Sequence, residues 1–172
     1  MEEKMENKSI REFAIEFETK GTNLYLSLAS KTTSILGKEL FYNLAQQEVQ
    51  HAWLFDRMYS LSTHENLPLK DIGDIESNLK EFWENAEKTE LKKEPGDLSG
   101  YILAMDMEKQ SISAYQNFLN QSKEDKEKDF LKWIIEEEKK HLEALNNVYH
   151  FLSDTGDWYQ AEESKKWNWM NQ

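Results

Sequence analysis

Two sets of carboxylate, phenol and imidazole side chains repeat along this chain. The first set contains two glutamates, a tyrosine and a histidine: Glu18, Tyr25, Glu48 and His51. Adding 90 to each of these numbers gives an identical residue in the second set: Glu108, Tyr115, Glu138 and His141. Carboxylate oxygens and imidazole nitrogens are ligands for iron, manganese and zinc, so the repeat indicates a site for metal ions.

Helices are the elements that the sequence predicts around both sets. Apolar and small residues recur at steps of four and three in the first segment, as in an amphipathic helix whose buried seam includes Phe17 and Leu24. The same reasoning predicts four long helices, at about 9–30, 37–61, 98–120 and 124–152. Short connections within each pair predict two antiparallel hairpins, and the fold class is all-α, a four-helix bundle.

Two segments lie outside these hairpins. The first, at about 62–97, is expected to be a long crossover connection with a short amphipathic helix at about 75–88. The second is a C-terminal tail, 153–172, expected to pack as a short helix on the bundle or on a partner subunit because it is rich in tryptophan: Trp158, Trp167 and Trp169. We predict a single domain over 1–172, with the bundle at about 9–152.

The glutamates of each hairpin lie at equal distances from its turn. In the first hairpin, with a turn near residue 33, Glu18 and Glu48 both lie 15 residues away, or roughly 22 Å. The second hairpin, with its turn near residue 123, repeats this spacing. Each histidine follows a glutamate by one helical turn on the same face. Packing the hairpins together is therefore expected to gather four carboxylates and two imidazoles in one site.

The negative charge of buried carboxylates must be balanced by positive charge. Four of them repel one another and lose hydration, which costs several kcal/mol per ion unless cations offset it. Two divalent ions carry the four positive charges that balance four carboxylates. Oxygen ligands with one imidazole per ion suit iron or manganese, whereas zinc prefers fewer ligands. We therefore expect two metal ions, either iron or manganese, with zinc as a further possibility.

Some positions have competing interpretations. A single Glu-x-x-His pair would be weak support for a metal site, and it is the full repeat at one offset that favours ligation. Glu137 also lies on the face of His141, but the repeat selects Glu138 because Gln47 is the equivalent of Glu137. Tyr25 and Tyr115 either hydrogen-bond the metal ligands or carry electrons, or they are ordinary core tyrosines with satisfied hydroxyls.

The repeated set resembles the ligands of the ferritin-like di-iron carboxylate superfamily, in which two helices each give a Glu and two others each give Glu-x-x-His. Within that superfamily, residues 9–152 resemble the rubrerythrin group. The resemblance implies a ferritin-like bundle around two iron ions. It assigns terminal carboxylates to Glu18 and Glu108, bridging carboxylates to Glu48 and Glu138, and nitrogen ligands to His51 and His141.

Two departures bear on the activity that the resemblance implies. Rubrerythrins usually carry a rubredoxin-like iron site on cysteines, and this chain has no cysteine. They also tend to have a further carboxylate on the third helix, where Met105 and Ser111 stand one turn either side of Glu108. The resemblance implies a di-iron oxidoreductase that reduces hydrogen peroxide or oxygen with an external electron donor such as a rubredoxin. A ferroxidase that stores iron, and a metal-binding bundle without redox turnover, are the alternatives.

The amino-acid composition limits the partners, cofactors and cellular locations that the protein can have. A net charge of −12 disfavours nucleic acid as a partner, because phosphate attracts basic surfaces. The absence of cysteine excludes disulfides, thiolate zinc sites and iron–sulfur clusters in this chain. There is no apolar run long enough for a signal peptide or a membrane span, so a cytoplasmic location without membrane contact is the expectation. A homo-oligomer, most simply a dimer, is also expected.

Overall fold

The computed structural model describes residues 9–60, 74–86, 97–153 and 170. This part of the chain contains five α-helices and no strand, so the all-α prediction is confirmed. In chain order the helices are α1 (Ile10–Lys31), α2 (Ile35–Ser60), α3 (Ile75–Asn85), α5 (Ser99–Gln121) and α6 (Asp125–Ser153).

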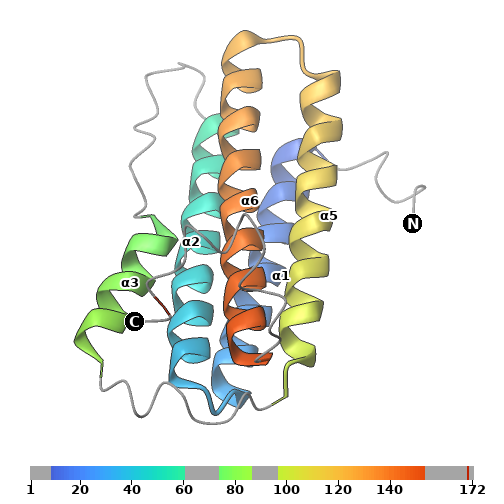
Figure 1. Ribbon diagram of the computed structural model, residues 1–172. Helices are drawn as coiled ribbons and strands as arrows, with labels where there is room; N and C mark the ends of the chain where they lie inside the picture. The colour runs from blue at the N-terminus through green and yellow to red at the C-terminus, as the bar shows by residue number, and fades with distance from the viewer. Residues whose placement is uncertain (1–8, 61–73, 87–96, 154–169, 171–172) are drawn as a thin grey trace.

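The four long helices form a bundle (Figure 1). Helix α1 packs along α2, and α5 packs along α6. The two pairs meet through contacts of α2 with α6 and of α1 with α5. Helix α3 lies on the outside of the bundle, where it contacts α2 and α6. Each helix of the bundle therefore turns one face toward a shared interior.

Side-chain caps fix several helix ends. The Ser9 hydroxyl accepts a hydrogen bond from the Glu12 N–H, and the Glu12 carboxylate accepts one from the Ser9 N–H, which makes a capping box for α1. Helix α2 begins at Ile35, two residues before the predicted start, because the Ser34 hydroxyl accepts from the Gly37 N–H. Gly37 is needed here for another reason, since a Cβ would overlap the Tyr101 hydroxyl.

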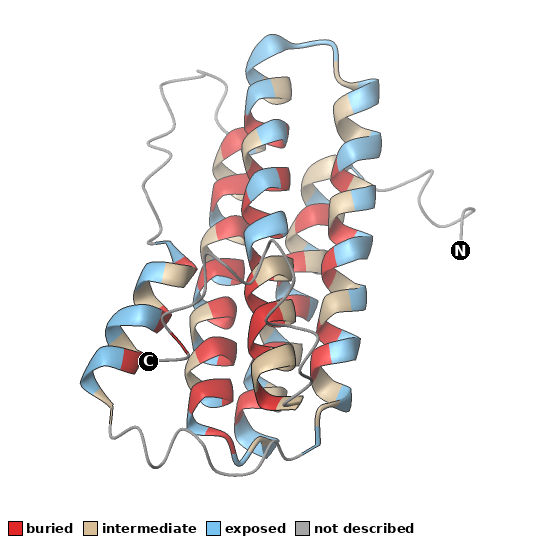
Figure 2. Cartoon of the chain, viewed as in Figure 1, coloured by how far each residue is buried: buried red, intermediate tan, exposed pale blue. Residues whose placement is uncertain are grey.

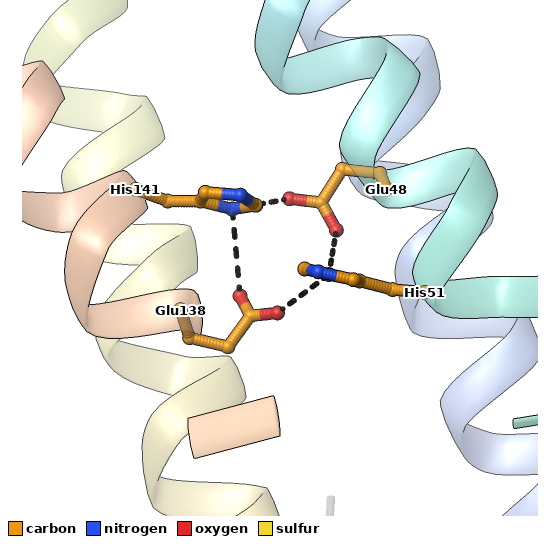
Figure 3. Close-up of side chains that lie close together, drawn as sticks. All are labelled: Glu48, His51, Glu138 and His141. Atoms are coloured by element: carbon orange, nitrogen blue, oxygen red, sulfur yellow. Dashed lines mark hydrogen bonds and ion pairs between the residues drawn. The ribbon is translucent and has the colours of Figure 1, made fainter. Parts of the chain in front are cut away.

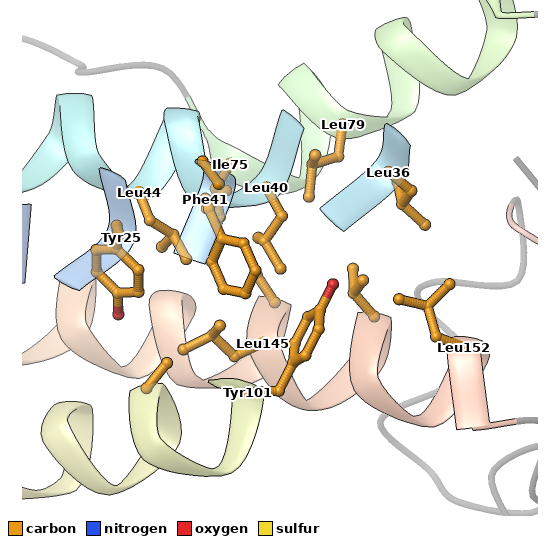
Figure 4. Close-up of a cluster of buried hydrophobic side chains, with 14 of the residues drawn as sticks. Tyr25, Leu36, Leu40, Phe41, Leu44, Ile75, Leu79, Tyr101, Leu145 and Leu152 are labelled. Atoms are coloured by element: carbon orange, nitrogen blue, oxygen red, sulfur yellow. The ribbon is translucent and has the colours of Figure 1, made fainter. Parts of the chain in front are cut away.

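Two apolar clusters lie along the bundle interior, and Figure 2 shows how the buried positions line the inner helix faces. The larger cluster includes Leu40, Leu44 and Leu145, and its side chains interdigitate in Figure 4. The smaller cluster includes Phe55 and Ile134. Along α2 and α6 the charged residues of the repeat fall between these two clusters, so a polar layer separates two apolar ones.

The predicted crossover helix corresponds to α3. Asp74 caps it by accepting from the Ser77 N–H at 3.1 Å, and Leu79 and Trp83 bury its inner face. It ends at Asn85, slightly before the predicted end near residue 88. The rest of the crossover and almost all of the Trp-rich tail lie outside the described residues. Among the helices that the structure describes, none has an apolar stretch sufficient to span a bilayer.

Candidate metal centre

All six predicted ligands lie inside the bundle. Each is at most 2% exposed to solvent: Glu18, Glu48, His51, Glu108, Glu138 and His141. They come from all four long helices. Helix spacing explains the burial, because each residue occupies the inner face of its helix at three- or four-residue steps from a core position.

Four of the six form the centre of the cluster (Figure 3). Glu48 and His51 on α2 face Glu138 and His141 on α6, and one ligand atom from each lies within 4.8 Å of the others. His51 Nδ1 is 3.0 Å from Glu138 Oε1, and His141 Nδ1 is 3.1 Å from Glu48 Oε1. The contacts are therefore reciprocal, as the repeat requires.

The remaining two carboxylates flank this centre. Glu18 Oε2 lies 3.7 Å from His51 Nδ1, and Glu108 Oε1 lies 3.7 Å from His141 Nδ1. Each imidazole thus directs Nδ1 at carboxylates from three helices. The structure brings together all six residues that the sequence singled out.

The two tyrosines contact the flanking carboxylates across the bundle. The Tyr25 hydroxyl donates a hydrogen bond to Glu108 Oε1, and the Tyr115 hydroxyl donates one to Glu18 Oε1. Both tyrosines are fully buried. Burial, followed by the nearby Glu18 carboxylate, raises the pKa of the Tyr115 hydroxyl well above its usual range, so this residue keeps its proton at neutral pH. The structure favours the interpretation in which each tyrosine holds a carboxylate of the site.

Without metal ions, protons balance the charge of the cluster. Burial and then repulsion from Glu48 and Glu138 raise the pKa of Glu18 well above its ordinary value. Burial and then Glu138 raise that of Glu108. Burial opposes the charged form of His141, but its carboxylate neighbours outweigh this and raise its pKa to about 10.

The pKa shifts of His51 and Glu48 follow from the same contacts. Burial lowers the pKa of His51, but the nearby carboxylates of Glu138, Glu18 and Glu48 outweigh this and raise it well above the ordinary value. Burial raises the pKa of Glu48. Its neighbours stabilise the charged carboxylate more strongly, so the pKa lies below the usual range. The metal-free site is therefore a carboxylate cluster that retains protons at neutral pH.

The donor set fits a pair of metal ions. Three buried atoms in the cluster make no hydrogen bond within the described structure: His51 Nδ1, His51 Nε2 and Glu138 Oε1. A buried polar atom without a hydrogen bond is costly, and two of these three, His51 Nδ1 and Glu138 Oε1, face each other at 3.0 Å inside the cluster. Four carboxylates and two imidazoles supply charge and ligands for two divalent cations. The residues that could hold them are the six predicted ones.

Residues around the cluster make its two halves unequal. The Ser111 hydroxyl donates to Glu138 Oε2 at 2.9 Å, whereas its repeat equivalent, Gly21, has no side chain to offer Glu48. A Cβ at Gly21 would lie 3.3 Å from Met107 Cε and 3.4 Å from the Glu48 carboxyl carbon, so it would touch both side chains. Ser111 was noted in the sequence only as a missing carboxylate, and its hydrogen bond was not predicted.

The two halves also differ at Nε2, the outer nitrogen of each imidazole. Gln47 Oε1 lies 2.7 Å from His141 Nε2. The repeat equivalent of Gln47 is Glu137, which pairs with Lys140 at 2.8 Å. The structure thus puts Glu138 in the centre and Glu137 outside it, as the repeat predicted. Gln47 is a positioning residue. The sequence analysis named it only as the repeat equivalent of Glu137 and gave it no role.

Gln47→Leu tests this positioning. An imidazole that offers Nδ1 to a metal carries its proton on Nε2, and Gln47 is the acceptor for that proton. Loss of the acceptor should weaken metal binding by about 10- to 100-fold. The measurement is an anaerobic Mn²⁺ titration against a competing chelator. Gln47→Glu should retain affinity, and Gln46→Leu, on the exposed side of α2, is the control. Equal affinity in Gln47→Leu and the wild type would remove Gln47 from the site.

Fold and site together define a class, the all-helical bundles with a buried carboxylate and imidazole centre. A family model described as rubrerythrin matches residues 10–149 of this chain. The chain therefore belongs to the rubrerythrin family, and the resemblance noted from the sequence is confirmed. Comparisons with the curated proteins and with the solved structures give no match.

Proposed function

We propose that this chain is a di-iron oxidoreductase that reduces hydrogen peroxide, or oxygen, at the buried cluster. The observation that carries the proposal is the convergence of four carboxylates and two imidazoles in an apolar interior, where three of their polar atoms make no hydrogen bond within the described structure. Membership of the rubrerythrin family supports the same assignment. A bound iron pair would supply the two electrons that break the O–O bond.

The protein would contribute ligands, orientation and exclusion of water. Glu48 and Glu138 are placed between the two imidazoles and would contact both ions, while Glu18 and Glu108 would each contact one. The Tyr25 hydroxyl would orient Glu108. The Tyr115 hydroxyl would orient Glu18 and would hold a proton beside the site at neutral pH. The apolar clusters above and below the polar layer limit entry of bulk water.

We also propose that the chain forms two antiparallel helical hairpins, which would give the site an approximate two-fold symmetry. Arg11 near the start of α1 pairs with Asp56 near the end of α2, which fits an antiparallel hairpin. The contacts between α5 and α6 and the offset of 90 fit a second hairpin of the same kind. Two such hairpins would place equivalent ligands on opposite sides of one axis. The electrons would come from an external carrier, such as a rubredoxin, since this chain has no cysteine to hold such a centre.

Anaerobic loading with Fe²⁺ followed by peroxide tests the activity. The loaded protein should develop near-UV absorption from oxidised, coupled iron, with about one peroxide consumed per iron pair. Glu48→Ala should abolish this change. Glu136→Ala removes an exposed α6 glutamate that pairs with Lys139 and should leave the change intact. Absence of oxidation in the wild type, or equal oxidation in Glu48→Ala, would reject the proposal.

A further inference from the structure

A cavity of about 310 Å³ lies at the end of the bundle where α1 ends and α5 begins. Apolar and aromatic side chains from three helices line it: Leu28, Phe41, Tyr101 and Leu103. None of the residues that line this cavity belongs to the metal centre. Sites for small molecules begin at about this volume and have mainly apolar walls with a few polar groups that fix the ligand. The cavity therefore has the size and the lining of a small-molecule site.

One buried polar group in this lining, the Tyr101 hydroxyl, makes no hydrogen bond within the described structure. Tyr101 is 1% exposed, and its hydroxyl points toward the start of α2 (Figure 4), where Gly37 leaves room for it. Thr32 borders Gly37 as well and also lines the cavity, so the hydroxyl lies at the cavity wall. Burial raises the pKa of Tyr101 well above its usual range, so the hydroxyl is a donor at neutral pH. A buried donor without an acceptor is costly, and an oxygen of a bound ligand would remove that cost.

The lining favours a neutral ligand with a planar ring. Leu28 and Phe41 offer apolar surface against which a ring can pack. The two charged residues of the lining, Lys31 and Asp97, are exposed to solvent. A charged group beside the buried Tyr101 hydroxyl would therefore lose its hydration without gaining a counter-ion. A carbonyl oxygen on a planar ring meets these conditions, because it accepts a hydrogen bond and carries no net charge.

A row of aromatic rings joins this cavity to the metal centre. The centroid of the Phe41 ring lies 4.8 Å from that of Tyr101 and 6.2 Å from that of Tyr25. The Tyr25 hydroxyl donates a hydrogen bond to Glu108, one of the six proposed metal ligands. All three rings belong to the larger apolar cluster, so water is excluded along the row. A ring bound in the cavity would lie at the outer end of a continuous aromatic connection to the site.

We propose that this cavity binds a small quinone, with one carbonyl oxygen accepting a hydrogen bond from the Tyr101 hydroxyl. Its role rests on the proposed function, because the quinone in its reduced form would be the external electron donor. The hydroquinone releases two electrons and two protons and becomes the quinone. Each of the two oxidised irons takes one of these electrons, which restores the iron pair that peroxide has oxidised. This chain, which has no cysteine for an iron centre of the rubredoxin kind, would then receive electrons from a small molecule.

Binding of 2-methyl-1,4-naphthoquinone to the metal-free full chain tests the site. The chain has no cysteine thiol that could add to this probe. Calorimetry should give one site per chain with a Kd on the order of 10–100 µM, as expected for a ligand of this size. Tyr101→Phe keeps the ring and removes the donor, so it should weaken binding about 5- to 10-fold with unchanged helical circular dichroism. Tyr149→Phe removes a hydroxyl from a neighbouring ring that does not line the cavity, and it should bind as the wild type does.

A second probe, 2-methylnaphthalene, has the same rings without the oxygens and should bind the wild type and Tyr101→Phe equally. No saturable binding of the quinone, equal quinone affinity in the wild type and Tyr101→Phe, or a difference that persists with 2-methylnaphthalene would overturn the site.

Electron supply is measured in protein that has been loaded with iron and oxidised by peroxide. The hydroquinone form of the probe, added anaerobically, should reduce the iron, with one hydroquinone consumed per iron pair. Tyr101→Phe should need about 5- to 10-fold more hydroquinone for the same rate. Binding of the probe without reduction of the iron would overturn its role as electron donor. Iron that peroxide does not oxidise would instead refute the proposed function, and the binding measurements, made without metal, would still decide the site.

Discussion

Glu48→Ala and Glu138→Ala should each lower the metal bound by this protein from two ions per chain to one or none. Each of these carboxylates lies between the two imidazoles, so its loss removes a ligand from both proposed ions at once. The affinity should fall by more than about 100-fold, since even outer-shell partners of a ligand are worth 10- to 100-fold. An anaerobic titration with Fe²⁺ or Mn²⁺, followed by metal analysis after gel filtration, measures the stoichiometry.

Stability provides an independent readout of the same change. Metal that binds the folded state stabilises it by about 2.7 kcal/mol when its concentration is 100 times the Kd. The wild type should therefore melt at a lower temperature in chelator than with Mn²⁺, and Glu48→Ala should melt at the same temperature in both. Glu136→Ala should behave as the wild type. Two ions per chain in Glu48→Ala, or a metal-dependent melting temperature in that variant, would contradict the assignment.

The metal-free protein should lose stability as the pH rises from about 6.5 to about 10. The raised pKa of His141, about 10, means that the folded state holds a proton that the unfolded chain releases near pH 6.5. The stabilisation from this proton is complete below pH 6.5 and is lost as the pH approaches 10. Glu18, Glu108 and His51 also have raised pKa values and act in the same direction. The total effect should be of the order of a few kcal/mol.

Metal should reverse much of this trend. Bound ions displace the protons of the cluster, so metal affinity increases with pH and offsets the loss. The lowered pKa of Glu48 acts in the opposite sense, because its contribution is present above about pH 4.5 and is lost at lower pH. Melting temperatures in chelator and in Mn²⁺, taken from pH 6 to pH 9.5, provide the comparison. A metal-free melting temperature that rises over this range would refute the charge balance derived for the site.

The sequence was sufficient to predict the helices and the residues that meet between them. The offset of 90 linked Glu18 to Glu108 and His51 to His141, and the structure buries all four together. Spacing succeeded because a helix converts residue number directly into height and direction. The pattern of apolar residues was less accurate about the inner face of α1.

Helix α1 illustrates why hydrophobicity alone can mislead. Phe17 and Leu24 were predicted to mark the buried seam, but both are only half-buried. The neighbouring residues, Glu18 and Tyr25, are fully enclosed instead. Polar side chains take the inner positions when other polar groups meet them there, and that compensation comes from helices distant in sequence. The ligand pattern identified Glu18. The apolar periodicity was right about Ala14 and Gly21, which are buried, but it named Phe17 and Leu24 instead of the buried residues that follow them.

Contacts between distant side chains were beyond sequence reasoning. The Ser111 bond to Glu138 and the Gln47 contact with His141 depend on how α5 packs on α6 and how α2 packs on α6. Residue types at these positions are compatible with many partners, and only the packed bundle selects one. The early start of α2 likewise depends on the Ser34 cap and on the space that Gly37 leaves for Tyr101.

Anomalous diffraction at the iron edge, from crystals grown anaerobically with Fe²⁺, tests the central assignment most directly. The six buried side chains should surround two peaks about 3.5–4 Å apart. His51 Nδ1 and His141 Nδ1 should bind one ion each, and Glu48 and Glu138 should contact both. A single peak, peaks only at the protein surface, or six side chains that retain their metal-free contacts in the presence of saturating iron would contradict a two-metal centre in this bundle.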